Sequence, residues 1–68
     1  MNDKIVIDPQ ICHGKPVIKG TRILVSNILS SLATGDSIEK IISDYPGLKT
    51  DDIYAALAFG SEKHLHKS

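Results

Sequence analysis

The 68-residue chain has no tryptophan, three other aromatic residues and a single cysteine. With so few aromatic rings, branched aliphatic side chains have to form the hydrophobic core. Cys12 has no second cysteine with which to pair, which excludes an internal disulfide and fits a reducing cytoplasm.

Long apolar runs are absent as well, which excludes a membrane-spanning helix. The first residues, Met1 to Lys4, lack the basic and apolar segments of a secretory signal peptide. We therefore expect a cytoplasmic protein that makes no use of a membrane. A chain of this length forms one domain, residues 1–68, whose thin core gains stability from a partner.

The chain has no excess of either charge, with eight basic and eight acidic residues. This balance argues against strong non-specific binding to nucleic acid, which depends on displacing counterions from phosphates. The charges are nevertheless segregated: residues 1–25 hold four cations and two acids, whereas residues 36–52 hold two cations and five acids. Such a layout suits a protein partner at least as well as a phosphate backbone.

Short extended segments are predicted within residues 5–24. Ile5–Ile7 is a β-branched run ended by Asp8-Pro9, as expected of a short edge strand. Two further segments, around Val17–Ile18 and Arg22–Leu24, are separated by Lys19–Thr21, where glycine favours a bend. These strands are too short to be stable alone, so they have to pack on helices or pair with another chain.

Three helices are predicted, over residues 25–34, 36–45 and 50–64, with a frayed tail at 65–68. Their apolar residues recur at helical spacing: Val25, Ile28, Leu29 and Leu32; Ile38, Ile41, Ile42 and Tyr45; Ile53, Ala56, Leu57 and Gly60. Gly35 is placed for a left-handed end to the first helix, Asp36 with Glu39 for a capping box, and Thr50 for the N-cap of the third helix. The fold class is therefore α+β and mostly α, and the last two helices form a candidate helix-turn-helix.

The third helix carries more apolar residues than one buried face requires. Tyr54, Ala55, Ala58 and Phe59 extend its apolar arc, which indicates a second contact surface. We expect a homodimer whose interface, or whose surface for another partner, includes Ile5, Val6, Ile7, Tyr54, Ala58 and Phe59.

Five segments in order resemble the domain-of-unknown-function 433 family (DUF433) over residues 5 to 60. They are Ile7–Pro9, Gly14–Ile23, Leu32–Gly35, Tyr45–Leu48 and Asp52–Leu57, of which the Gly-Lys-Pro-Val-Ile-x-Gly-Thr-Arg run is the most specific. The resemblance implies a homeodomain-like, helix-turn-helix domain of a prokaryotic antitoxin or transcriptional regulator, similar to the VapB type. It also implies a dimer, a cognate toxin with a PIN-like nuclease fold, and no established catalytic residues. The chain lacks a long extension after the three helices, so its core and strands would have to mask the toxin.

Nucleic-acid contacts are predicted at Lys15, Lys19, Arg22, Lys49, Thr50 and Tyr54. The alternative is that the glycines serve turns and the cations are solvated or paired with Asp3 and Asp8. The run Gly14-Lys15 does not make a P-loop, because the preceding glycine and the following Ser or Thr are missing. Asp51 and Asp52, beside the start of the candidate recognition helix, would face phosphates unfavourably.

No catalytic, cofactor or metal site is predicted. Cys12-His13 and His64-x-His66 do not supply four ligands at structural spacing, and Cys12 has no base to activate it. The leading hypothesis is a non-enzymatic, antitoxin-like regulator that associates with operator DNA. The alternative is a protein-interaction module that masks a nuclease toxin and hardly binds DNA. Neither involves a small-molecule substrate.

Overall fold

Three helices and a two-stranded sheet form the fold of the computed structural model, which describes the backbone of residues 3–65 and the side chains of residues 3–61. The order is β1 (Ile5–Val6), the one-turn helix η1 (Cys12–Gly14), β2 (Val17–Ile18), α1 (Val25–Ala33), α2 (Ile38–Asp44) and α3 (Thr50–Leu65). This confirms the predicted α+β, mostly helical class. The helix bounds differ from the prediction by one or two residues. Leu65 is still helical, and the rest of the predicted tail lies outside the described residues.

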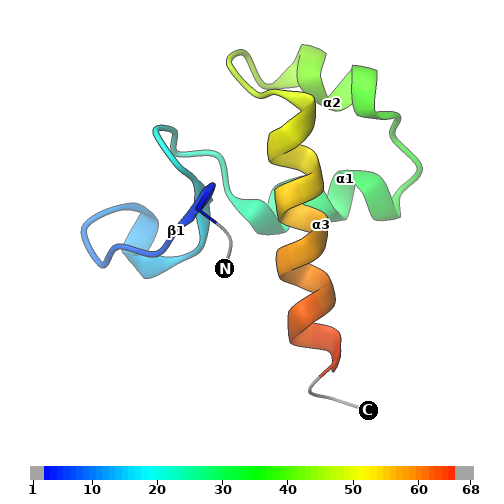
Figure 1. Cartoon of the computed structure of the whole chain (residues 1–68). Helices are drawn as coiled ribbons and strands as arrows, with labels where there is room; N and C mark the ends of the chain where they lie inside the picture. The colour runs from blue at the N-terminus through cyan, green and yellow to red at the C-terminus, as the bar shows by residue number, and fades with distance from the viewer. Residues whose placement is uncertain (1–2, 66–68) are drawn as a thin grey trace.

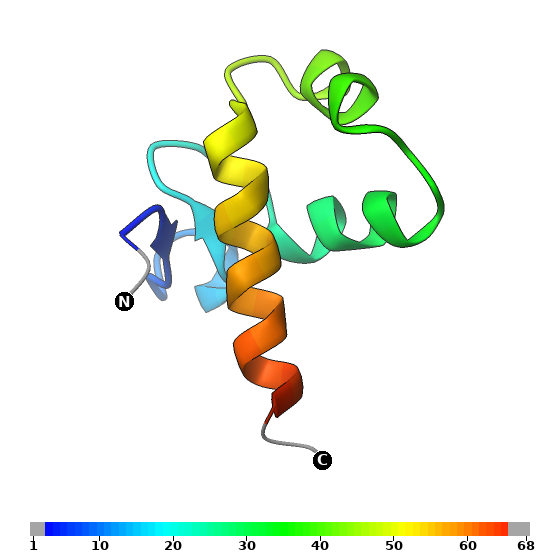
Figure 2. The same ribbon diagram turned by 45° about the vertical axis from the view of Figure 1, so that its right-hand side comes forward.

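α3 is the central helix of the fold, against which other elements pack. Figures 1 and 2 show the sheet on one side of it and the α1–α2 pair on the other. β1, α1 and α2 all contact α3. Within the described part of the chain, no helix is long and apolar enough to cross a membrane.

The sheet is smaller than predicted because Arg22–Leu24 does not form a third strand. β1 and β2 are antiparallel, and Leu24 contributes one isolated bridge to Val17. The N–H of Ile23 donates to the hydroxyl of Thr21 at 3.0 Å, so that side chain takes a donor that a strand would use for its ladder. Gly20, at the third position of the turn closed by Thr21 N–H to Ile18 carbonyl, has a φ of 81°.

The core lies where the sheet and the three helices meet. Its buried members are Ile18, Val25, Ile28, Ile41, Leu48, Ile53 and Ala56. Five of these residues belong to the three predicted stripes, each of which contributes at least one, and this confirms most of the helical pattern. Leu57 is an exception, since 41% of it is exposed although it was expected on the buried face of the third helix.

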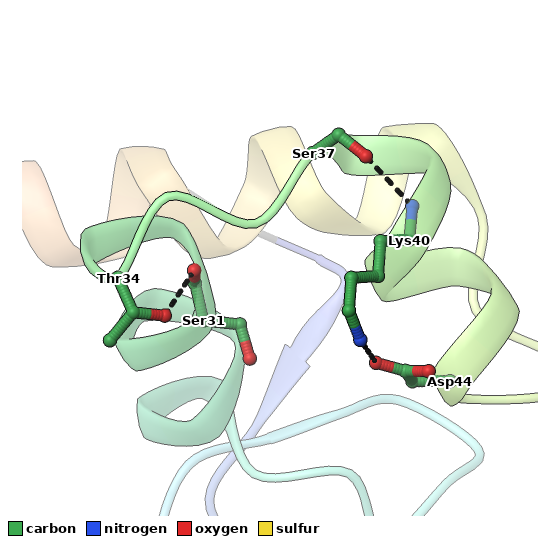
Figure 3. Close-up of polar contacts among 5 residues, drawn as sticks. All are labelled: Ser31, Thr34, Ser37, Lys40 and Asp44. Atoms are coloured by element: carbon green, nitrogen blue, oxygen red, sulfur yellow. Dashed lines mark hydrogen bonds and ion pairs between the residues drawn. The ribbon is translucent and has the colours of Figure 1, made fainter.

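α1 ends where Gly35 adopts a φ of 97°, as predicted for a left-handed cap. The N–H of Asp36 donates to the carbonyl of Ser31 and the N–H of Gly35 to that of Leu32, the paired bonds of a Schellman motif. The hydroxyl of Thr34 also donates to the Ser31 carbonyl, at 2.9 Å (Figure 3). The backbone N–H of Asp36 is therefore part of the motif that ends α1.

The predicted capping box of Asp36 and Glu39 is therefore wrong. Ser37 is the N-cap of α2, and its hydroxyl accepts the N–H of Lys40 at 3.1 Å (Figure 3). Since α2 starts one residue later than a cap at Asp36 would require, Glu39 is the second helical residue and not the third, from which it would reach back to the cap.

α3 starts with a different cap from the one predicted. Thr50 is its first helical residue, which leaves Lys49 at the cap position. The third helical residue, Asp52, accepts the N–H of Lys49 through Oδ2 at 3.0 Å. The Asp52 carboxylate, in the first turn, thus accepts the backbone N–H of the cap residue itself. The side chain of a threonine cap would not satisfy that donor.

Candidate nucleic-acid interface

A series of contacts connects three lysines from separate segments to the start of α3. The N–H of Lys19, after β2, donates to the carbonyl of Lys4, before β1, at 2.8 Å. Lys4 in turn places its Nζ 3.8 Å from Oδ1 of Asp52 in the first turn of α3. Lys49 directly precedes that turn, and all three lysines are exposed. The short sheet therefore brings cations next to the first turn of the candidate recognition helix.

Arg22 and Lys15 lie beside η1. The thiol of Cys12 contacts the carbonyl of Arg22 at 3.8 Å, and the N–H of Lys15 donates to the carbonyl of Cys12. Arg22 lines a shallow depression together with Ile11, Gly20 and Thr21. This second group of cations is attached to the first through the β2 hairpin.

The backbone of η1 is left-handed throughout. Cys12, His13 and Gly14 have φ values of 50°, 59° and 81°, although the first two are not glycine. Such angles are unfavourable for residues with a Cβ, so surrounding contacts have to hold them. In the described part of the chain, no three His, Cys, Asp or Glu side chains gather in a group able to hold a metal ion.

Lys15, Lys19, Arg22, Lys49, Thr50 and Tyr54, the predicted nucleic-acid contacts, are all exposed. Among the described ion pairs, neither involves Lys15, Lys19 or Arg22, and Asp8 instead accepts the N–H of Gln10. The alternative in which these cations pair with Asp3 or Asp8 has no ion pair to support it within residues 3–61. Their charge is thus available to an anionic partner.

The acidic residues at the start of α3 are not equivalent. Asp51 is exposed, whereas Asp52 is 8% exposed and its two oxygens face Lys4 and the N–H of Lys49. A phosphate beside this turn would meet one exposed carboxylate, not two. The structure therefore reduces the predicted repulsion without removing it.

The residues predicted for a dimer or partner interface, Ile5, Val6, Ile7, Tyr54, Ala58 and Phe59, fall into two groups. Ile5 and Phe59 pack against the core, and Val6 is half-buried in β1. Ile7, Tyr54 and Ala58 are exposed, with 59% of Ile7 and 56% of Tyr54 accessible. Only the second group offers substantial free apolar surface.

Lys4 and Asp52 belong to this site but were not among the residues predicted for it from the sequence. Lys4 counted as one of several N-terminal cations, and Asp52 as a favourable charge in a first helical turn. Their proximity arises because β1 packs on α3, a contact between residues nearly fifty positions apart. The acidic residue at the third helical position is the one available signal, since that position can cap backwards.

Comparison with known proteins identifies relatives without a described activity. The family described as "Protein of unknown function (DUF433)" matches residues 5–60. An uncharacterized protein, y4eO, from Sinorhizobium fredii is 31% identical over 61 residues, covering 90% of this chain and 28% of that protein. The crystal structure of a DUF433 member protein from Anabaena variabilis superposes with a TM-score of 0.83 at 28% identity. It covers 93% of this chain and 62% of the Anabaena chain.

Proposed function

The chain belongs to the DUF433 family, and we propose that it is a small, non-enzymatic, cytoplasmic regulator that associates with DNA, resembling an antitoxin of the VapB type. The observation that supports this most is the grouping of exposed cations on two turns beside a helix-turn-helix. Lys49 directly precedes the first turn of α3, and Lys19 is joined through its backbone to Lys4, which pairs with Asp52 in that turn. Lys15 and Arg22 lie farther along the hairpin, beside η1.

The binding mode that fits these residues uses phosphates more than bases. Lysine and arginine side chains on turns position a protein on the duplex without reading its sequence. Thr50 and Tyr54 are the exposed uncharged polar side chains that α3 offers near its start, and neither forms the bidentate pairs that distinguish bases well. We therefore propose that α3 orients the domain while the basic turns supply most of the affinity.

Fluorescence anisotropy tests this proposal with two duplexes of equal length, one from the region upstream of the gene and one with that sequence shuffled. Lys19→Gln and Arg22→Gln should each weaken binding and reduce the slope of log K against log salt by about 1, as loss of one phosphate contact does. Lys40→Gln, a matched neutralisation on α2, should leave the slope unchanged. Equal weakening by all three variants, or no binding of either duplex by the wild type, would contradict the proposal.

A second candidate function is masking of a PIN-like nuclease toxin with little DNA binding. The exposed acidic side chains of Glu39, Asp44 and Asp51 favour it, because they offer charge complementary to a basic, nucleic-acid-binding partner. Co-expression with the product of the neighbouring gene distinguishes the two candidates. If masking is the main function, Lys19→Gln and Arg22→Gln should leave co-purification intact, whereas Asp51→Lys should weaken it.

A further inference from the structure

Two turns in the described part of the chain, Ile18–Thr21 and Tyr45–Leu48, are of the same kind. In both, the N–H of the last residue donates to the carbonyl of the first at 3.0 Å. The third residue of each is a glycine with positive φ, 81° at Gly20 and 93° at Gly47, as in a type II turn. A basic residue follows each turn directly, so corresponding groups occur in the same order at the two places.

The two turns differ in what the next N–H binds. After the second turn, the N–H of Lys49 donates to Oδ2 of Asp52 at 3.0 Å, so an anionic group lies directly against this position. After the first turn, the corresponding N–H of Arg22 has no acceptor among the residues that the structure describes, and the same is true of the N–H of Gly20. A carboxylate therefore occupies one position, whereas the other is open to an anion from outside.

The open position lies at a shallow depression with a volume of about 520 Å³. It is lined by Ile11, Gly20, Thr21 and Arg22. The hydroxyl of Thr21 donates to the carbonyl of Ile18 at 2.8 Å and accepts the N–H of Ile23 at 3.0 Å. These two bonds hold the backbone on both sides of Arg22, so its donors are positioned before a ligand arrives.

The charge at the depression is positive. Arg22 is exposed, and neither ion pair among the described side chains involves it. Lys19, the second residue of the turn, is also exposed. Asp8 is the acid nearest to Ile11 in the chain, and its Oδ1 accepts the N–H of Gln10 at 2.8 Å. An anion that binds here therefore meets two cations and two backbone donors.

We propose that this depression with the donors of Gly20 and Arg22, here called the turn site, binds one phosphate group. The phosphate oxygens accept the two backbone N–H groups, and the guanidinium of Arg22 pairs with the same phosphate. A guanidinium fork matches the geometry of phosphate oxygens, and hydrogen bonds to an ionised acceptor are strong. Phosphate fits better than carboxylate because its additional oxygens leave no donor of the site without an acceptor.

The turn site deepens the proposed function, and only the source of the phosphate rests on that function. In a nucleic acid the group is a backbone phosphodiester, and the aliphatic wall formed by Ile11 suits the apolar carbons of the adjoining sugar. One fixed phosphate would set the position of the domain on the duplex without reading its sequence. Arg22 then differs from the exposed lysines, which act by charge alone.

NMR titration of the full, ¹⁵N-labelled chain with inorganic phosphate at constant ionic strength tests the site without DNA. The amide signals of Gly20 and Arg22 should shift together and saturate with one dissociation constant. Gly47 is the matched control, because it occupies the same place in a turn that has no open N–H after it, and its signal should stay in place. Acetate should bind about ten-fold more weakly or less, since it leaves one donor without an acceptor.

Two results of this titration would overturn the proposal. Equal shifts of Gly20 and Gly47, or shifts that do not saturate, would show that phosphate acts only through diffuse charge. Acetate that binds as tightly as phosphate would identify the turn site as a carboxylate site for an acidic protein.

The source of the phosphate is tested with the duplexes described above. Arg22→Lys keeps the charge but loses the fork, so it should raise the dissociation constant for DNA about ten-fold while the salt slope stays the same. Lys19→Arg is the matched control that also preserves charge, and it should leave the constant unchanged. If Arg22→Lys bound the duplex as tightly as the wild type, the backbone phosphodiester would be excluded. A saturating phosphate titration without any duplex binding would contradict the proposed function but support the turn site, with free phosphate or a phosphomonoester as its ligand.

Discussion

Oδ1 of Asp52 lies 3.8 Å from Nζ of Lys4, so a buried carboxylate in the first turn of α3 joins that helix to the first strand. Its other oxygen accepts the N–H of Lys49 at 3.0 Å. The Asp52 side chain thus both pairs with Lys4 and caps the start of α3, where that helix meets β1. The two contacts are chemically different, and substitutions separate them.

Asp52→Ala should destabilise the fold by about 1–2 kcal/mol, because it removes the acceptor for the Lys49 N–H. Asp52→Asn keeps an acceptor oxygen and should cost less than Asp52→Ala. Lys4→Met removes the ion pair with Asp52, whose lysine is half-exposed, and should cost less than about 1 kcal/mol. Urea unfolding measures all three. A Lys4→Met loss as large as that of Asp52→Ala would mean that the ion pair, and not the cap, holds the junction.

The N-cap of α2 gives a second prediction. Ser37→Ala should cost about 1 kcal/mol, since it leaves the N–H of Lys40 without its hydroxyl partner. Asp36→Ala should cost less, because Asp36 contributes its backbone N–H, and not its side chain, to the end of α1. The difference in urea midpoint between the two variants is the measurement. The reverse order would restore Asp36 as the cap.

Two glycines should respond differently to alanine. Gly47 has a φ of 93° with no atom within 4 Å of an added Cβ, so Gly47→Ala meets backbone strain alone and should cost about 1–2 kcal/mol. Gly60 is helical, and an added Cβ would lie 2.9 Å from Cδ1 of Leu29.

Because Leu29 is half-buried and the contact involves the end of its side chain, that side chain can shift into a groove that Leu29 and Gly60 both line. Alanine also gains about 1 kcal/mol of helix propensity over glycine, which offsets that shift. Gly60→Ala should therefore change the unfolding free energy by less than about 0.5 kcal/mol, the remainder left by these two opposing effects. Thermal unfolding of both variants would contradict this account if Gly60→Ala were the more damaging.

The pair Lys40–Asp44 predicts a pH effect. The hydrogen bond from Lys40 Nζ to Asp44, at 2.8 Å, raises the pKa of Lys40 above its ordinary value of 10.5, as do the charges of Asp44 and Asp36. The small stabilisation from this pair is complete at pH values below 10.5 and is lost as the pH rises through the raised pKa. Titration of the Lys40 side chain by NMR should show its pKa falling in Asp44→Asn and changing less in Asp36→Asn. An unchanged pKa in Asp44→Asn would show that the exposed pair does not form in solution.

The helical part of the fold could be predicted because its signals are local. The apolar residues from Val25 to Leu32 define the buried face of α1. Gly35 ends the helix because glycine, without a Cβ, adopts the left-handed conformation at little energetic cost. The caps were harder, since Asp36 and Ser37 are both good capping residues one position apart. The choice depends on the Schellman bonds that already use the backbone of Asp36, and those bonds depend on where α1 ends.

The candidate site likewise has parts that local sequence signals predict and parts that depend on packing. The amino-acid sequence by itself determined the helices, the turn at Gly20 and which cations are on turns, because spacing, glycine and proline act through neighbouring backbone. The tertiary structure decided that Lys4 meets Asp52, that Leu57 is exposed while Ala56 is buried, and that residues of α1 and α3 together line a groove. Those outcomes depend on how helices and strands pack, and packing joins residues whose separation along the chain carries no local signal.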